Sequence, residues 1–491
     1  MKTLNYIFTL LLILFLGCTT QETKQMDPNI LFIYLDDLGY GDLGCYNPES
    51  KIPTPNIDKL AQEGISFTNA HTTAAICGLS RYGLMTGRYP WRRGVGGTGN
   101  GEKFRDIFIE SNRLTIASLL KKQGYNTAQL GKWGLRHNYS DAVKEGMEPG
   151  YRDSYDFPNK RLLGSQLVGF DYSWCMTHLF PAPGTSTIGN SKHQLENGLP
   201  IDTTLKVDDP YQWLPQSASK VVEYLECYAG KKDNPKFGID SNNPFFIYWD
   251  PPSPHEPIVP NKEFLGKSGA GDYGDFVVEI DHYVGIMLNA LDLLDLDENT
   301  IVIFSSDNGP ENYAYPRIQE YQHYSMGKFR GLKRDSYEGG TRVPFIVRWP
   351  NKIKENTTTD EPICLVDIMA SFADMFDYEL PDNAGEDSYS ILPVLFGEEF
   401  EKPARGPIVY HTPDGRFAIR KNNMVYINAR SGGSREPQWF RDERGVISHN
   451  QEVELFDMTK DPPQLKNIAK ENSSIVKDMK TTLDKIFNES S

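Results

Sequence analysis

The sequence has few cysteines, and their spacing excludes a dense disulfide frame. Its 491 residues contain six cysteines and no C-x-x-C motif: Cys18, Cys45, Cys77, Cys175, Cys227 and Cys364. A cysteine-based zinc site needs closely spaced ligand pairs, so none is expected here. Hydrophobic residues make up 39% of the chain and aromatic residues 12%, which is enough for a large core. The length predicts roughly two or three domains.

Positive charge is also scarce. The chain has 51 Lys and Arg residues against 66 Asp and Glu residues, for a formal net charge of -15. Nucleic acids and anionic membrane surfaces reward clustered positive charge, so we expect neither as the main partner. A small anionic substrate is compatible with this balance, because a few cations or a bound metal can reverse the field inside one cleft.

Long apolar runs are absent except at the N-terminus. Residues 1–17 carry an early lysine and then a stretch of apolar residues that is too short to span a membrane comfortably. This pattern predicts a signal peptide. The following Cys18 resembles the lipidated cysteine of a bacterial lipobox, so we expect an exported, periplasmic or outer-membrane lipoprotein of a Gram-negative bacterium. Contact with a membrane would then run only through the lipid anchor; a plain secretory signal with an incidental Cys18 is the alternative.

Beyond this segment, strand-like runs alternate with helical patterns. Examples are "NILFIYL" before "NIDKLAQEG", and "DFVVEIDHYVGIMLNALDLL" before "TIVIFSSDNG". The alternation predicts an α/β fold with a largely parallel central sheet flanked by helices, over residues 27–400. Residues 138–215 are rich in Gly, Pro, Tyr and Asp, and we interpret them as a long excursion over the sheet edge. Residues 401–491 predict a small antiparallel sheet plus a terminal helix.

Four of the predicted strands end in polar residues. These residues are Asp36 and Asp37, Lys132, His255, and Asp307 with Asn308. The carboxyl ends of parallel strands share one edge of a sheet, which is where ligands gather in α/β proteins. One polar strand end is commonplace, whereas four predict a single site.

The acidic members of this set predict a metal site. Asp36, Asp37, Asp307 and Asn308 offer only oxygen ligands, which hard cations such as Ca²⁺ or Mg²⁺ prefer. A divalent cation would also relieve the repulsion between the adjacent carboxylates. Taken singly, each pair has an alternative interpretation as a helix cap or turn.

Cys77 precedes a stretch of helix-forming residues, "LSRYGLM". It is therefore expected at a helix N-terminus, where partial positive charge favours an anion and lowers a thiol pKa. Arg81, four residues later, would lie on the same helix face. The alternative for a lone cysteine is a small buried hydrophobic residue.

At this point the sequence resembles the sulfatase family, of the alkaline-phosphatase-like fold, over nearly the whole mature chain. The segments "CGLSR" and "LMTGR" match the family's first signature, in which the cysteine is oxidised to formylglycine by a maturation enzyme. The resemblance implies that modified Cys77 is the nucleophile and a further metal ligand, and that the metal is Ca²⁺, with Mg²⁺ possible.

The resemblance extends to other segments in the family's order. "YLDDLGYGDLG" and "SSDNG" resemble its metal-binding segments, while "GKW", "PHEP" and "FRGLKRDSYEGGTRVPF" resemble segments that bind sulfate and protonate the leaving group. The implied catalytic residues are Cys77, Arg81, Lys132, His255 and Lys333. Among them, Lys132 and Lys333 would bind sulfate, and His255 would be the leaving-group acid.

Two residues depart from the family pattern. Leu79 replaces the usual Pro or Ala in the first signature, which bears on how efficiently Cys77 is converted. Gly134 replaces the histidine that normally follows G-K-W, so that role is not carried over. His137 and His323 are candidate substitutes that could bind substrate, although a lone histidine is more often a loop or core residue.

The expected substrate is a sulfated polysaccharide or oligosaccharide. Trp91, Tyr313 and Tyr315 could stack on sugar rings, although each has packing as its alternative. Four arginines could bind further sulfate or carboxylate groups, or could simply be solvated: Arg92, Arg93, Arg136 and Arg317.

Two other functions fit parts of the sequence. A phosphomonoester or phosphonate hydrolase could use the same scaffold, but phosphatases of this superfamily surround their metals with histidines that the acidic segments here lack. A non-catalytic, surface glycan-binding lipoprotein is supported only by Leu79 and Gly134.

Overall fold

The computed structural model describes residues 27–93, 108–147, 156, 160–179, 191–201, 209–398, 404–433, 435–446 and 452–489. The expected signal segment and Cys18 lie outside these residues. Within them, no helix combines the length and apolar character needed to cross a membrane. Five of the cysteines are described, and all five are free thiols: Cys45, Cys77, Cys175, Cys227 and Cys364.

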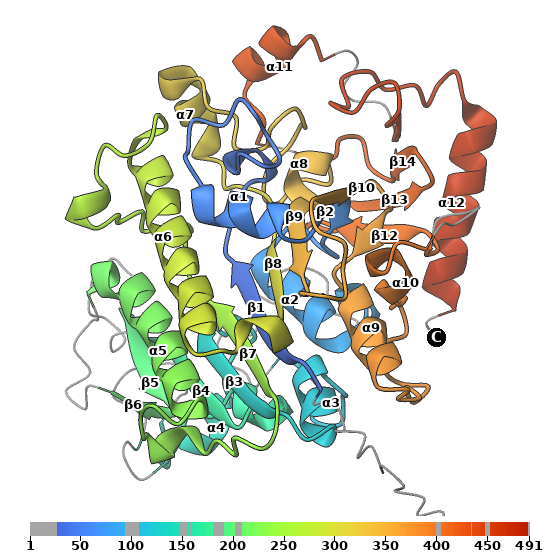
Figure 1. Cartoon of the computed structure of the whole chain (residues 1–491). Coiled ribbons are helices and arrows are strands. Elements are labelled where there is room, and N and C mark those ends of the chain that lie inside the picture. The colour runs from blue at the N-terminus through green and yellow to red at the C-terminus, as the bar shows by residue number, and fades with distance from the viewer. Residues whose placement is uncertain are drawn as a thin grey trace, which may run out of the picture.

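A twisted mixed sheet forms the centre of the molecule (Figure 1). Its strands in the described residues, in order across the sheet, are β10 (Thr357–Thr359), β2 (Ile65–His71), β9 (Arg342–Arg348), β8 (Thr300–Ser306), β1 (Asn29–Leu35), β7 (Phe245–Asp250), β3 (Asn126–Gly131), β4 (Tyr172–Leu179), β5 (Ser191–Glu196) and β6 (Leu199–Pro200). β11 (Ile363–Cys364) also pairs with β2. The central strands β8, β1, β7, β3 and β4 run parallel to one another, so their carboxyl ends share one edge.

Helices cover both faces of this sheet, because its central strands are apolar on both sides. In β1, Ile30 and Phe32 face one core, whereas Leu31, Ile33 and Leu35 face the other. The first core is closed by α2 (Cys77–Thr86), α3 (Ile116–Lys122), α9 (Asp367–Met375) and α10 (Leu392–Leu395). The second is closed by α1 (Pro55–Gln62), α5 (Trp213–Tyr228) and α6 (Gly271–Leu293). The predicted fold class is therefore confirmed.

The segment 138–215 differs from its prediction. Instead of only crossing the sheet edge, it adds β4, β5 and β6 to the sheet, with β4 parallel to β3 and antiparallel to β5. The alternating pattern of "YSWCMTHL" in β4 is hidden in the sequence by the Gly- and Pro-rich stretches on both sides. Tertiary pairing with β3 decides the outcome there.

A second, four-stranded antiparallel sheet follows in the C-terminal part. It consists of β12 (Ile408–His411), β13 (Phe417–Lys421), β14 (Met424–Ile427) and β15 (Glu454–Asp457). The terminal helix α12 (Ser473–Asn488) packs against it through buried Met479 and Leu483, on the right of Figure 1. The domain boundary at about residue 400 stays a prediction. The remaining α-helices of the described chain are α4 (Tyr139–Ala142), α7 (Ala314–Tyr321), α8 (Glu338–Thr341) and α11 (Gln438–Arg444).

Candidate active site

The carboxyl ends of β1 and β8 bring two distant acidic segments together. The two strands pair in register up to Leu35 opposite Ser306. The next residues therefore meet: the backbone N–H of Asp307 donates to the Leu35 carbonyl at 3.1 Å, and the backbone N–H of Asp37 donates to Asp307 Oδ1 at 3.1 Å. The expectation that these acids share one edge thus follows directly from strand pairing.

Asp37 turns the chain sharply after the strand. Its φ of 68° lies in the left-handed region, which a residue with a side chain rarely adopts. The turn directs the Asp37 carboxylate toward Asn308, whose Nδ2 donates to Asp37 Oδ1 at 2.7 Å. All four predicted ligand residues, Asp36, Asp37, Asp307 and Asn308, are completely buried.

Three cationic side chains surround the buried carboxylates. The Nε of Arg81 donates a hydrogen bond to Asp307 Oδ2 at 3.1 Å, and the Nη2 of Arg81 lies 3.0 Å from the same oxygen. Lys333 contacts the Asp37 carboxylate at 2.7 Å, and Lys132 Nζ donates to Asp36 Oδ2. Each acid therefore has its own cation, from a different segment of the chain.

Burial and the nearby charges shift the pKa values of Asp36 and Asp307 in opposite directions. Burial raises the pKa of Asp36, but Lys132, His255 and the other nearby cations outweigh burial and hold that pKa well below its usual value. In contrast, burial and the neighbouring Asp36 raise the pKa of Asp307 to about 7. Ionising Asp307 is therefore unfavourable in this buried, negatively charged setting, and a bound cation would offset that cost.

The donor atoms present fit a hard divalent cation. Asp36 Oδ1 and Asn308 Oδ1 are buried oxygens without a hydrogen-bond partner in the described structure, which is costly unless another group satisfies them. Ligand atoms of Asp36, Asp307 and Cys77 lie within 4.8 Å of one another, as do those of Asp36, Asp37 and His255. Carboxylate and amide oxygens are the ligands that Ca²⁺ and Mg²⁺ prefer.

Cys77 is the first residue of α2, as the sequence predicts. Its side chain is half-buried, and Lys132 Nζ lies 3.8 Å from its Sγ. The thiol therefore faces the acidic cluster on one side and, on the other, a cavity of about 190 Å³. A small anion bound here would meet the positive end of the helix dipole as well as the lysine.

Lys132 reaches this position because the chain passes unusually close to β7. Gly131, the last residue of β3, has a φ of 140°, and a Cβ there would lie 2.2 Å from the Asp250 carbonyl oxygen. Only glycine permits this approach. The side chain of Lys132, the next residue, is 16% exposed. It is therefore held in the site but remains accessible to a substrate.

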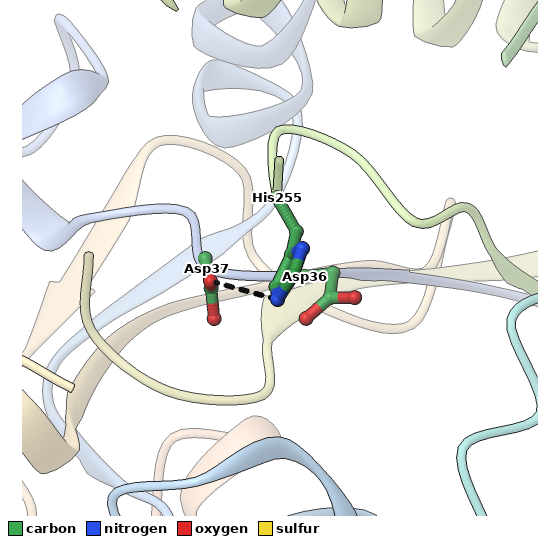
Figure 2. Close-up of side chains that lie close together, drawn as sticks. All are labelled: Asp36, Asp37 and His255. Atoms are coloured by element: carbon green, nitrogen blue, oxygen red, sulfur yellow. Dashed lines mark ion pairs between the residues drawn. The ribbon is translucent and has the colours of Figure 1, made fainter. Parts of the chain in front are cut away.

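His255 approaches the cluster from the loop after β7 (Figure 2). Its Nε2 lies 3.7 Å from Asp37 Oδ2, and its Nδ1 lies 2.8 Å from the carbonyl oxygen of Glu256. Since a carbonyl only accepts, Nδ1 carries a hydrogen and Nε2 faces the acids. Burial lowers the pKa of His255, although the nearby Asp36 opposes that effect.

Sequence reasoning missed Asp250 and Gln129. The Asp250 carboxylate accepts from Arg81 Nη1 at 3.2 Å and from Gln129 Nε2 at 2.8 Å. This buried chain of contacts fixes the guanidinium between Asp250 and Asp307. Asp250 ends the apolar strand "FFIYWD" in the same way as Asp36 ends β1, so the same strand-end signal could have found it.

The candidate substrate residues His137 and His323 are placed in the interior. His323 is 1% exposed, and its Nε2 lies 2.8 Å from Asp42 Oδ1. His137 is 3% exposed and contacts the Cys175 thiol at 3.4 Å, and burial lowers its pKa to about 4. The structure thus shows both rings in packing contacts, while their predicted substrate role stays a prediction.

Arg317 is also buried, and its guanidinium lies 3.6 Å from the ring centroid of Tyr273 and 5.0 Å from that of Tyr313. Tyr273 in turn donates to Asp42 Oδ2 at 2.6 Å. Together with His323, these contacts hold the turn that follows Asp37. The structure thus shows Arg317 in contact with these aromatic rings, while its predicted substrate role stays a prediction.

The remaining aromatic and basic candidates divide between packing and the site. Trp91 packs on Tyr89 and Phe487, and Tyr315 packs on Phe440. Arg92 forms a two-pronged ion pair with Asp387. Arg93 lies 3.9 Å from Glu110. Of the four arginines considered, Arg136 lines the cavity beside Cys77.

Gly134 cannot be replaced by a larger residue without a local change. Its φ is 70°, and a Cβ there would lie 2.8 Å from Arg81 Cδ. A side chain would therefore meet both an unfavourable backbone conformation and the arginine that binds Asp307. Glycine at position 134 therefore fits both the left-handed backbone conformation and the close approach of Arg81.

Comparison with known proteins gives a consistent result. The Sulfatase family model matches residues 28–378. The N-acetylgalactosamine-6-O-sulfatase of Bacteroides thetaiotaomicron is 33% identical over 534 aligned residues, which cover 99% of each chain. Human arylsulfatase A is 30% identical, over 90% of this chain and 83% of the relative.

A solved structure from Bacteroides thetaiotaomicron, described as part of the metabolism of multiple glycosaminoglycans, has a similar fold. It superposes with a TM-score of 0.76 at 29% identity, covering 94% of this chain and 99% of the other. The similarity therefore includes the central sheet and the C-terminal part.

Proposed function

The chain belongs to the sulfatase family and is a sulfuric ester hydrolase, and we propose that it removes sulfate from a sulfated carbohydrate, using a formylglycine derived from Cys77 and one divalent cation. The resemblance noted in the sequence is thereby confirmed at the level of the family. The observation that best supports the proposal is the meeting of ligand atoms from Asp36, Asp307 and Cys77 within 4.8 Å.

Four residues would hold the cation: Asp36, Asp37, Asp307 and Asn308. When bound, a divalent cation stabilises negative charge on substrate oxygens and lowers the pKa of a neighbouring hydroxyl. The two unsatisfied buried oxygens and the raised pKa of Asp307, about 7, support this assignment. We propose Ca²⁺, while the oxygen ligands would also accept Mg²⁺.

Formylglycine, as its hydrate, supplies one hydroxyl that attacks sulfur and a second whose deprotonation releases the sulfate. Within the chain, Arg81 has the role of holding the first turn of α2 against Asp307. The N-terminus of α2 adds partial positive charge beside residue 77. Both features favour the negatively charged form of the nucleophile.

Lys132 and Lys333 would bind the transferring sulfuryl group. Lys132 contacts the Asp36 carboxylate and Lys333 contacts the Asp37 carboxylate. From these positions both ammonium groups could also bind oxygens of the substrate sulfate. Removing one preorganised donor from such a site typically lowers kcat by roughly 10²–10³. The lysines therefore account for a large part of the expected rate enhancement.

His255 would protonate the departing sugar oxygen through Nε2. Its hydrogen on Nδ1 is fixed by the Glu256 carbonyl, which leaves Nε2 to exchange the catalytic proton. Burial lowers the pKa of the free histidine. A bound sulfate ester brings a negative charge that raises the pKa again, so proton uptake would accompany substrate binding.

Relatives suggest the substrate class. One relative that matches 99% of this chain is named N-acetylgalactosamine-6-O-sulfatase, and a similar solved structure is described in the context of glycosaminoglycans. We propose a sulfated glycosaminoglycan fragment as substrate, with N-acetylgalactosamine 6-sulfate as the first compound to assay.

Maturation and location complete the proposal. A formylglycine-generating enzyme would act on "CGLSR" before or during export, and lipidation of Cys18 would anchor the protein in the periplasm or at the outer membrane. Radiolabelled palmitate should enter the wild-type protein and should not enter Cys18→Ala. Label in the variant would contradict the anchor.

The function is tested by product release from paired esters. We expect wild-type protein to release sulfate from N-acetylgalactosamine 6-sulfate and from 4-nitrophenyl sulfate, and Cys77→Ala to release none. Phosphate release from 4-nitrophenyl phosphate should be far slower. Preference for the phosphate ester would instead favour the phosphomonoesterase alternative, and binding without hydrolysis of either would favour a glycan-binding protein.

A further inference from the structure

The loop that carries Lys132 has an unusual backbone. Between Gly131 and His137, three residues have φ in the left-handed region: Gly131 at 140°, Gly134 at 70° and Arg136 at 63°. The conformation is ordinary for glycine, but for an arginine it is uncommon. Such a residue persists when its surroundings determine the conformation, and these positions concentrate at functional sites.

Gly134 and Arg136 of this loop border a cavity. It has a volume of about 190 Å³, and its walls include Cys77, Gly78, Leu79, Phe108, Gly134 and Arg136. Since a water molecule takes about 30 Å³ of the liquid, this volume holds roughly six waters. The space therefore suffices for a sulfate or carboxylate group together with part of the ring that bears it.

Gly134 and Gly78 both line this space next to Cys77. A Cβ on Gly134 would collide with Arg81, so this wall consists of backbone. A Cβ on Gly78 would lie 3.5 Å from the Gly134 carbonyl oxygen, which is ordinary contact, so the two glycines face each other across a narrow gap. Two positions without side chains therefore border the cavity beside Cys77.

Among the described residues that line it, the cavity combines an apolar wall with one cationic side chain. Leu79 and Phe108 supply apolar surface, and the Arg136 guanidinium lies 5.9 Å from the centre of the Phe108 ring. The guanidinium of Arg93 also packs on this ring, at 4.3 Å. A guanidinium beside apolar surface suits a ligand that has both an oxyanion and a carbon ring.

We propose that this cavity binds a second oxyanion of the substrate and that Arg136 recognises it. The inference rests on the proposed sulfatase function and makes it more specific: the preferred substrate carries a further sulfate ester or carboxylate on the same sugar or on its neighbour. Gly134 presents only backbone to this cavity, and Arg136 lines it together with Cys77. Arg136 is then a specificity-determining residue, distinct from the groups that hold the scissile sulfate.

The test compares substrates with one and with two anionic groups. The probes are N-acetylgalactosamine 6-sulfate, N-acetylgalactosamine 4,6-disulfate and an unsaturated uronosyl–N-acetylgalactosamine 6-sulfate disaccharide. The disulfate reports a second sulfate, and the disaccharide reports a carboxylate. We expect wild-type kcat/KM to be about tenfold or more higher for at least one of the dianionic probes, because charge-assisted hydrogen bonds are the stronger ones.

The variants are Arg136→Ala, Arg136→Lys and, as a control on an exposed arginine, Arg161→Ala. Arg136→Ala should remove the preference while leaving kcat/KM for the monosulfate and for 4-nitrophenyl sulfate within about threefold of wild type, since it deletes one contact to the second anion. Arg136→Lys should restore part of the preference, and Arg161→Ala should keep all of it.

Two results would overturn the inference. One is a wild-type enzyme that prefers neither dianionic probe; the other is an Arg136→Ala variant that loses activity equally on every substrate while its melting temperature and Cys77 conversion match wild type. Failure of wild-type protein to cleave even 4-nitrophenyl sulfate would overturn the proposed function itself, and this inference with it.

Discussion

Asp37 and Asp307 are 270 positions apart in the sequence, yet the backbone N–H of Asp37 donates to Asp307 Oδ1 at 3.1 Å. The contact joins the ends of β1 and β8, the two strands that pair at the middle of the sheet. It brings buried carboxylates so close together that burial and the charge of Asp36 raise the pKa of Asp307 to about 7. A bound divalent cation would stabilise the ionised form of such a cluster.

Divalent cation should stabilise the folded protein. At a Ca²⁺ concentration about 100 times its dissociation constant, binding to the native state alone contributes about 2.7 kcal/mol. Thermal unfolding after chelation should therefore shift upward when Ca²⁺ is added back. Asp36→Asn should lose most of this shift, whereas Asp360→Asn, on an exposed carboxylate, should retain it. An equal shift in both variants would place the ion elsewhere.

The two lysines should act on kcat. Lys132→Ala and Lys333→Ala are each expected to lower kcat for 4-nitrophenyl sulfate by roughly 10²–10³, because each removes a preorganised positive charge. The control is Lys352→Ala, which changes an exposed lysine. Circular dichroism should show folded protein in all three. Activity within a factor of about three of wild type in both Lys132→Ala and Lys333→Ala would contradict their assignment.

Gly134 and Gly124 form a matched pair for testing the loop around Lys132. Both have positive φ, at 70° and 90°, but a Cβ on Gly124 meets no atom within 4 Å, whereas one on Gly134 meets Arg81. Alanine at either position should cost about 1 kcal/mol or more of stability from backbone strain. Only Gly134→Ala should also lower kcat strongly. Similar kcat values for the two variants would show that Arg81 is not displaced.

His137 should make stability depend on pH. Burial lowers its folded-state pKa to about 4, below the ordinary 6.5. The unfolded chain therefore binds the proton first, and stability is lost as pH falls below about 6.5. Between pH 7.5 and pH 5 the loss from this group is about 2 kcal/mol. Urea unfolding at the two pH values should show a smaller loss for His137→Asn, and an unchanged loss would contradict a buried neutral ring.

Glu338 should stabilise the packing of the C-terminal four-stranded sheet against the central sheet. Its carboxylate accepts from Arg342 Nε at 2.6 Å and from Arg420 Nη1 in β13 at 2.9 Å. Burial raises its pKa, but the two arginines outweigh burial and hold the pKa at about 2. The stabilisation is thus present above pH 4.5 and is lost as pH falls toward 2.

Replacing Glu338 by Gln leaves the buried arginines without a charged partner, which typically costs about 3–5 kcal/mol. Urea unfolding at pH 7 measures this loss. Glu379→Gln, which changes an exposed acidic side chain, is the control and should cost less than about 0.5 kcal/mol. A loss below about 1 kcal/mol in Glu338→Gln would contradict a strong link between the two sheets.

Strand-end residues are the part of the site that sequence reasoning predicts best. Asp36, Lys132 and Asp307 each follow an apolar run, and parallel pairing brings such ends together without any knowledge of side-chain contacts. The helix position of Cys77 is predicted equally well, from the helix-forming residues that follow it.

Other features depend on contacts that no local pattern reveals. β4 pairs with β3 despite its Gly- and Pro-rich surroundings. His323 reads as a possible substrate residue in the sequence, yet it lies 2.8 Å from Asp42 and supports the turn beneath the site. A Cβ on Gly134 would collide with Arg81, which is 53 positions earlier in the sequence. No local pattern predicts this contact, because only the packing of the two segments creates it.

The proposed mechanism depends most on the chemical state of residue 77 in the active protein. The measurement is the mass of the proteolytic peptide that contains it, taken on protein from the native host that releases sulfate from N-acetylgalactosamine 6-sulfate. The predicted result is a peptide in which an aldehyde or its hydrate replaces the thiol. An active protein whose residue 77 is wholly unmodified cysteine would contradict the account.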